Sequence, residues 1–137
     1  MGLILDSSVL IDAERQARPV SELLTSIRMV FGVTEILLSA VSVIELEHGI
    51  WRANTPELAR RRRIYLEEVF AAIPVQAFTK EMGQLAAKID AEARQTGSVI
   101  PFADLQIGVT AVHLGCAIAT RNVRHFRMIP NLVVMPF

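Results

Sequence analysis

The chain has 137 residues, of which 52% are hydrophobic and 20% are charged, and its 14 basic residues balance its 14 acidic ones. This length suits one domain with a real core, and the composition excludes a disordered or fibrous chain. The neutral balance excludes a global positive field of the kind that holds proteins on nucleic acid, but it allows a local basic patch. The single cysteine, Cys116, excludes an internal disulfide and a cysteine-based zinc site.

The first elements are predicted from LILDSSVLID at residues 3 to 12, which indicate a short buried strand over residues 3 to 5 and a buried helix that includes Val9. Asp6 stands at the junction of the two. As a single residue it is explained as a helix cap, because a carboxylate accepts hydrogen bonds from the free amides of the first turn. The alternative is that Asp6 belongs to a site, and this residue alone does not decide between them.

Membrane and export segments are not expected. No positively charged region precedes the first apolar stretch, and Asp6 interrupts that stretch at once, so a signal peptide is not predicted. No apolar run approaches the roughly 20 residues that a membrane span needs. We therefore expect a cytoplasmic protein.

The later elements follow from hydrophobic spacing and from residues that begin and end helices. Helices are expected over residues 20 to 31, 42 to 53, 56 to 72, 80 to 97 and 102 to 115. Strands are expected over residues 35 to 40, 73 to 78, 116 to 120 and 132 to 135, with a polar turn between the last two. Gly32 is predicted to end the first helix of this series, and Pro74 favours an edge position for its strand.

Strands therefore alternate with helices along the whole chain. This order is typical of a parallel sheet that is covered on both faces. We predict one α/β domain over residues 1 to 137, with four to five short parallel strands and helices on both faces of the sheet.

Parallel sheets bind ligands beyond the carboxyl ends of their strands, and four polar residues are predicted to lie there. Asp6 follows the first strand, and Asn122 follows the strand that ends at Thr120. Glu45 and Asp104 are predicted in the first turns of two helices next to strands. Taken one by one, each has a structural explanation: a capping box from Ser42 to Glu45, a favourable helix dipole for Asp104 and a turn for Asn122.

Taken together, the three carboxylates indicate a metal site. Asp6, Glu45 and Asp104 each have apolar neighbours on both sides, which favours positions at the sheet edge rather than in open solvent. Carboxylates that converge there raise one another's pKa unless a cation joins them. Oxygen ligands without Cys or His favour Mg²⁺ or Mn²⁺, and substrate phosphates often complete such sites. The predicted chemistry is phosphodiester or phosphoryl transfer.

Four blocks, LILDSSVLID, SAVSVIELEHGI, PFADLQIGVTAVHLG and IATRNVRHF, together resemble PIN-domain ribonucleases of the VapC toxin type, in order and in spacing along essentially the whole chain. The resemblance implies a Mg²⁺-dependent endoribonuclease that forms a homodimer and is inhibited by a cognate VapB-like antitoxin. It also implies that Asp6, Glu45 and Asp104 are the metal ligands. Asn122 occupies a position where many PIN domains have a fourth acid, and Ser7 and Thr120 match small polar residues beside the acids.

In the implied mechanism a bound metal lowers the pKa of water and neutralises charge on the scissile phosphate of RNA. Asp6 and Asp104 would be the main ligands, Glu45 would ligate or orient the attacking water, and Asn122 would hydrogen-bond a water or the phosphate. The alternative function is a catalytically silent PIN-like module that binds RNA or protein.

Two further expectations concern surfaces. The run Arg60 to Arg63 has two open interpretations, a solvated helix face or an RNA-backbone contact. The apolar helices at 42 to 53 and 56 to 72 are expected to form a groove in which an antitoxin tail places a basic side chain over the carboxylates. The three histidines have no metal-ligand spacing, and His125 is a candidate to support the site loop.

Overall fold

A computed structural model describes residues 1–33 and 35–137. The strands are β1 (Gly2–Leu5), β2 (Glu35–Ser39), β3 (Val75–Gln76), β4 (Ala117–Thr120) and β5 (Val134–Pro136). The helices are α1 (Ser7–Arg15), α2 (Val20–Phe31), α3 (Ala40–Trp51), α4 (Pro56–Ala72), α5 (Lys80–Gln95), α6 (Phe102–Leu114) and α7 (Val123–Phe126). Within the described part of the chain, no helix is both long and apolar enough to cross a membrane.

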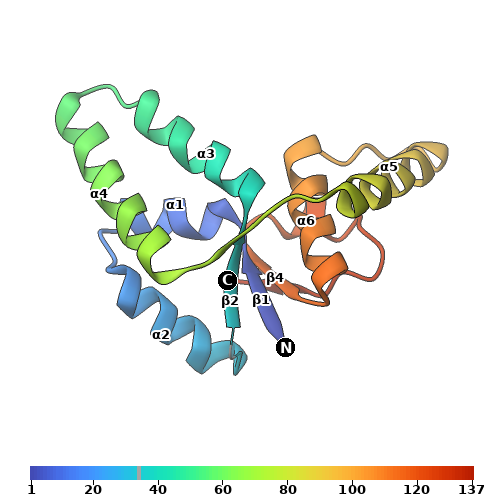
Figure 1. The fold of residues 1–137 in the computed structure, drawn as a ribbon, viewed down its shortest axis with the longest axis horizontal. Coiled ribbons are helices and arrows are strands. Elements are labelled where there is room, and N and C mark those ends of the chain that lie inside the picture. The colour runs from blue at the N-terminus through green and yellow to red at the C-terminus, as the bar shows by residue number, and fades with distance from the viewer. Residues whose placement is uncertain (34) are drawn as a thin grey trace.

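The five strands form one sheet in the order β3-β2-β1-β4-β5, and every pair is parallel. This confirms the predicted parallel α/β architecture. From β1 the chain adds β2 and β3 on one side and then returns to add β4 and β5 on the other side (Figure 1). Such a reversal of strand order opens a crevice beyond the carboxyl ends of the two central strands, here β1 and β4.

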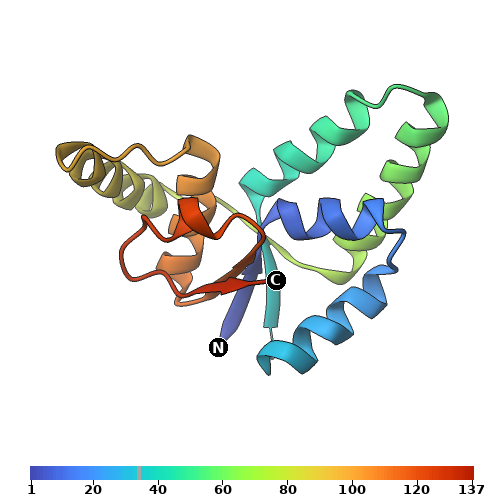
Figure 2. The same ribbon diagram turned by 180° about the vertical axis from the view of Figure 1, so that it is seen from behind.

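The central strands bury both of their faces. Leu3 and Leu5 pack with α1, α2 and α4, whereas Ile4, between them, packs with α5 and α6. This alternation follows from the period of two in an extended strand. It explains why helices stand on both sides of the sheet, as Figures 1 and 2 show.

Helix α3 begins two residues earlier than predicted. The side chain of Ser39 caps it, because Ser39 Oγ accepts a hydrogen bond of 3.2 Å from the amide of Val41. The predicted capping box from Ser42 to Glu45 is therefore wrong. Ser42 lies inside the helix, fully buried, and its hydroxyl has no hydrogen-bond partner among the described residues. Since α3 starts at Ala40, Glu45 lies in its second turn rather than its first.

The remaining differences concern short elements. The strand predicted over residues 73 to 78 is only Val75–Gln76, but its edge position is confirmed. The last strand lies at Val134–Pro136, two residues later than predicted at its start, and the predicted polar turn contains the short helix α7. Gly32 ends α2 as predicted, with a left-handed φ of 63° that suits glycine.

Candidate active site

Asp6 stands at the N-cap position of α1, but its side chain makes no capping hydrogen bond. The residue is 2% exposed, and its carboxylate accepts hydrogen bonds from Ser8 Oγ at 2.6 Å and from Thr120 Oγ1 at 2.8 Å. Its backbone amide donates to the carbonyl of Ala119. The carboxylate is therefore held against the end of β4, and a simple cap does not account for its position.

Glu45 extends from α3 toward the same edge of the sheet. Its Oε1 accepts a hydrogen bond of 3.0 Å from Ser7 Oγ, which follows Asp6 in the chain. Burial raises the pKa of Glu45 above its ordinary value, and the negative charges of Asp6 and Asp104 raise it further, whereas the Ser7 hydrogen bond opposes the rise. Glu45 is thus close enough to both aspartates to be affected by their charges.

Asp104 lies in the first turn of α6, as predicted. Its Oδ2 is 2.7 Å from Nδ1 of His125, the third residue of α7. Burial raises the pKa of Asp104, the hydrogen bond from His125 lowers it, and the charge of Asp6 raises it again. Each of the three predicted acids therefore carries its own hydroxyl or imidazole partner, and they affect one another electrostatically.

Asn122 has a different environment. It is exposed at the N-cap position of α7, where its side chain makes no capping hydrogen bond. Its backbone amide donates to Thr120 Oγ1 at 2.9 Å, and Thr120 in turn donates to Asp6. Asn122 is therefore linked to the acids through its backbone, while its amide group faces solvent.

The donor set fits a hard divalent cation in chemical terms, because it consists of carboxylates whose mutual repulsion a cation would relieve. The present positions of these carboxylates are less favourable for binding a cation. Across residues 1–33 and 35–137, no three Asp, Glu, His or Cys side chains form a group placed to hold a metal ion. The hydrogen bonds from Ser7 and His125 hold Glu45 and Asp104 in their present positions. Each bond uses one carboxylate oxygen, Oε1 of Glu45 and Oδ2 of Asp104, so the other oxygen of each group is available to a cation once the side chains move closer together.

Two residues with close contacts to the acids were not among the predicted site residues. Ser8 donates to Asp6 and accepts a hydrogen bond of 3.1 Å from the amide of Arg121, so it joins the ends of β1 and β4. The serine pair directly after Asp6 was the available signal. His125 was expected only as a support for the loop, and its contact with Asp104 depends on the turn formed by α7, which the sequence did not predict.

The arginine run in α4 is engaged mainly within the fold. Arg61 pairs with Glu14 at 3.1 Å, and Arg62 donates to the carbonyl of Gly49. Arg63 makes two hydrogen bonds of 2.7 Å to the carboxylate of Glu47. Contacts within the fold account for these three arginines better than contacts with an RNA backbone do.

A cavity of about 130 Å³ lies between α1, α3 and α4, next to Glu45. Aliphatic side chains and a tyrosine form the larger part of its wall, and charged groups come from Glu14, Arg15, Glu45 and Arg62. Its apolar lining includes Leu10, Ile11, Leu46, Leu66 and Val69. An apolar segment with a basic end would match this combination of side chains.

The sequence of the chain matches the family model for the PIN domain over residues 3–131. Among curated proteins it is similar to Ribonuclease VapC1 of Rickettsia felis, with 27% identity over 135 residues that cover 98% of this chain and 96% of that protein. It is also similar to Ribonuclease VapC2 of the same organism, with 23% identity over 99 residues and 72% coverage of each chain.

Solved structures share the fold. VapBC2 from Rickettsia felis bound to a fragment of promoter DNA contains a chain that superposes with a TM-score of 0.86 at 20% identity, covering 100% of this chain and 99% of that one. DNA-bound VapBC from Salmonella typhimurium gives a TM-score of 0.83 at 19% identity, with 99% and 98% coverage. At these identities the superpositions establish the architecture.

Proposed function

The chain belongs to the PIN domain family, and from this premise we propose that it is a metal-dependent endoribonuclease that acts as the toxin of a toxin–antitoxin pair. The curated relatives carry the name Ribonuclease VapC. We propose RNA as the substrate, hydrolysis of its phosphodiester bonds as the reaction, and Mg²⁺, with Mn²⁺ as a substitute, as the cofactor.

One observation carries this proposal: three carboxylates from three elements lie at the carboxyl edge of the sheet and act on one another. Glu45 has a raised pKa to which Asp6 and Asp104 both contribute, and Asp104 has a raised pKa to which Asp6 contributes. A fold gains no stability from such repulsion. Its presence at the crevice of a parallel sheet is therefore best explained by a function that uses a cation.

Asp6, Glu45 and Asp104 would hold the metal, which would supply a water of lowered pKa and offset charge on the phosphate. Ser8 and Thr120 fix the Asp6 carboxylate by two hydrogen bonds, so this ligand is already oriented. Ser7 and His125 each hold one of the other two acids, Glu45 and Asp104, by a hydrogen bond. The exposed amide of Asn122 is available to hydrogen-bond a water or a phosphate oxygen.

For partners we propose a VapB-like antitoxin and a second copy of this chain. Support for the antitoxin comes from the similar fold of chains in the solved complexes VapBC2 from Rickettsia felis and VapBC from Salmonella typhimurium. The cavity between α1, α3 and α4 offers an apolar lining beside Glu45, which suits a tail that ends in an arginine near the carboxylates. We place the protein in the cytoplasm, where RNA and a co-translated antitoxin are available.

The proposal is tested by RNA cleavage with Mg²⁺ or Mn²⁺ and with EDTA. Cleavage should occur with either metal and stop with EDTA. Asp104→Asn should lower the rate by at least 100-fold, about 2.7 kcal/mol of barrier, because it removes a ligand charge. Asp90→Asn is the matched control, since Asp90 forms a surface pair with Arg94 on α5, and it should cleave like the wild type. Cleavage that persists in EDTA would refute the metal mechanism.

A catalytically silent PIN-like binding module is the second candidate. The specific observation in its favour is that no three ligating side chains among the described residues are placed to hold a metal together. Cleavage of RNA distinguishes the two candidates. A silent module binds RNA or protein without cleaving RNA at any concentration of Mg²⁺ or Mn²⁺, and Asp104→Asn then changes no rate.

A further inference from the structure

Charge is distributed unevenly along this neutral chain. No Asp or Glu follows Asp104, so the stretch from Leu105 to Phe137 carries three arginines and no carboxylate side chain. These are Arg121, Arg124 and Arg127, and they fall in or beside α7. The cluster of Asp6, Glu45 and Asp104 therefore lies beside a segment that carries arginines and no acidic side chain.

Helix α7 is fixed on two sides. Phe126 is fully buried against α6, and His125 contacts Asp104 at 2.7 Å. Arg124 and Arg127 are exposed. Three residues along a helix correspond to a rotation of 300°, so these two side chains leave the helix about 60° apart, on the same side. Figure 2 shows α7, in red, beside α6.

The two arginines differ from three others in the chain. Arg121 is 3.3 Å from Asp12 in an exposed ion pair, and Arg61 and Arg63 are paired with glutamates. Arg124 and Arg127 form no ion pair and no side-chain hydrogen bond with any residue that the structure describes. Their guanidinium groups need no rearrangement of the fold to accept an anion.

We propose that Arg124 and Arg127 contact backbone phosphates of the RNA strand next to the acidic cluster and hold the strand there for cleavage. This inference rests on the proposed function. Carboxylates repel the polyanion that they are meant to act on, and nearby arginines offset this repulsion. Contacts to phosphates position a nucleic acid without selecting its sequence. Arg124 and Arg127 are thus positioning residues, joined to the acids through His125.

A protein partner fits this surface less well. Between Arg121 and Leu132, all of which the structure describes, no large hydrophobic side chain is exposed. Protein interfaces depend on buried apolar or aromatic anchors at their centre. The segment from Arg121 to Leu132 presents two unpaired arginines without such an anchor, which matches the chemistry of a phosphate backbone.

The experiment measures the affinity of a fluorescein-labelled single-stranded RNA of 12 nucleotides by anisotropy at several NaCl concentrations, in EDTA so that no strand is cut. Losing two phosphate contacts should reduce the slope of log K against log salt by about 1.4, at roughly 0.7 per contact. The variant is Arg124→Gln/Arg127→Gln. The pair Arg124→Lys/Arg127→Lys, which keeps both charges, should retain the wild-type slope.

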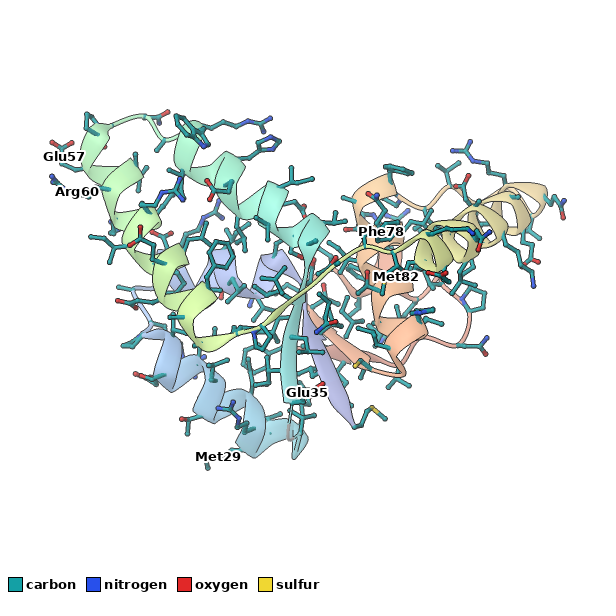
Figure 3. All side chains as sticks on the ribbon, viewed as in Figure 1. Met29, Glu35, Glu57, Arg60, Phe78 and Met82 are labelled. Atoms are coloured by element: carbon teal, nitrogen blue, oxygen red, sulfur yellow. The ribbon has the colours of Figure 1, made fainter. Side chains whose placement is uncertain are left out.

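Arg60→Gln is the matched control. Arg60 is exposed like the two α7 arginines, but it stands near Glu57 at the start of α4, away from α6 (Figure 3). It should leave the slope unchanged. Equal slopes for the wild type and the α7 double variant would overturn the proposal, and so would a loss of about 0.7 in Arg60→Gln, the share of one phosphate contact.

Two further results separate this inference from the proposed function. If the double variant loses slope as expected but the wild type never cleaves RNA, the nuclease fails and the phosphate surface stands. If the wild type cleaves RNA and the double variant binds with an unchanged slope, the nuclease stands and the phosphate surface fails. An unchanged slope together with weaker antitoxin binding would identify a protein interface and overturn the proposal.

Discussion

At the scale of single residues, Asp6 shows how a residue at a capping position can have another role. It precedes α1, but its carboxylate contacts Ser8 and Thr120 and forms no cap. Both hydroxyls donate to the same oxygen, Oδ2, so an asparagine that presents its carbonyl oxygen there would keep both hydrogen bonds. The substitution Asp6→Asn therefore removes a charge while preserving the contacts.

We expect Asp6→Asn to leave the metal-free protein as stable as the wild type or more stable, because one of three mutually repelling charges is lost. Mg²⁺ at 100 times Kd should stabilise the wild type by about 2.7 kcal/mol and so raise its melting temperature, and Asp6→Asn should abolish this rise. The measurement is thermal melting of both proteins in EDTA and in saturating Mg²⁺. Equal metal-induced shifts in the two proteins would remove Asp6 from the metal site.

Two glutamates on one helix should respond to pH in opposite ways. The pKa of Glu45 is raised above 4.5, mainly by burial. Its folded form therefore holds a proton more tightly than the unfolded chain, and its contribution to stability, complete below pH 4.5, is lost as the pH rises through the folded pKa. The pKa of Glu47 is lowered, first by hydrogen bonds from Arg63. Its contribution is present above pH 4.5 and is lost as the pH falls through the folded pKa.

The test is urea unfolding of Glu45→Gln and Glu47→Gln in EDTA between pH 3 and 7, each compared with the wild type. The free energy of unfolding of Glu45→Gln should rise relative to the wild type as the pH increases above about 4.5. That of Glu47→Gln should fall relative to the wild type as the pH increases toward about 4.5 and then stay level. The same sign of change in both variants would contradict the opposite environments described for the two side chains.

At the scale of elements, close packing at Gly108 keeps α7 against α6. A Cβ at this position would be 2.3 Å from Cδ1 of Ile129 and 3.3 Å from Cδ1 of Phe126. Alanine favours a helix by about 1 kcal/mol over glycine, but overpacking a buried site costs about 1–3 kcal/mol. We expect Gly108→Ala to lower the free energy of unfolding in urea by up to about 2 kcal/mol.

Two variants identify the cause of that loss. Ile129→Val removes Cδ1, so Gly108→Ala/Ile129→Val should be more stable than the sum of the single changes by at least about 0.5 kcal/mol. Gly49→Ala is the matched control in α3, because a Cβ there meets nothing within 4 Å, and it should gain about 0.5–1 kcal/mol. Strict additivity of the two changes at 108 and 129 would show that they do not compete for the same space.

The arginine run is the second case at this scale, because it links α4 to α1 and α3. Glu14 is 9% exposed, and its partner is Arg61. Arg61→Gln should lower the free energy of unfolding by about 1–3 kcal/mol, since it leaves a buried carboxylate without its cation. Arg60→Gln should stay within about 0.5 kcal/mol of the wild type. Equal urea midpoints for the two variants would indicate that the pair with Glu14 contributes nothing.

At the scale of the whole molecule, the parallel sheet could be predicted because buried strands alternate with helices along the chain. This alternation can be read from the spacing of hydrophobic residues. The convergence of Asp6, Glu45 and Asp104 followed from the rule that strand ends meet at one edge. The hydrophobic period of a sequence does not show which acceptor or donor each serine or threonine hydroxyl contacts. The predicted Ser42 cap was wrong because Ser39 occupied that position. The pairing of His125 with Asp104 depends on a four-residue helix whose hydrophobic signal is limited to Val123 and Phe126.

Interaction between the whole protein and its antitoxin is the last property to test. If the antitoxin tail occupies the cavity between α1, α3 and α4, a charged side chain on its apolar wall should weaken inhibition. Ile11 lines that wall and is only partly exposed. Ile11→Arg should raise the antitoxin concentration needed for half-inhibition at least 10-fold, which corresponds to about 1.4 kcal/mol, because the guanidinium would replace an apolar contact of the tail and compete with its basic end for the cavity carboxylates.

The antitoxin to be tested is the product of any short open reading frame found directly upstream. It is co-expressed with each variant, and each cleavage rate is expressed relative to that variant's own uninhibited rate. Met29→Arg is the control, because Met29 is 81% exposed at the far end of α2 and does not line the cavity (Figure 3). It should be inhibited like the wild type. Equal inhibition of Ile11→Arg and Met29→Arg would place the tail elsewhere, whereas full activity of the wild type at a saturating ratio would refute the partner itself. An inhibitory tail explains the apolar wall and the neighbouring acids together, because its apolar part would fill the cavity and its basic end would pair with the carboxylates. Without such a tail, the wall and the acids would each require a separate explanation.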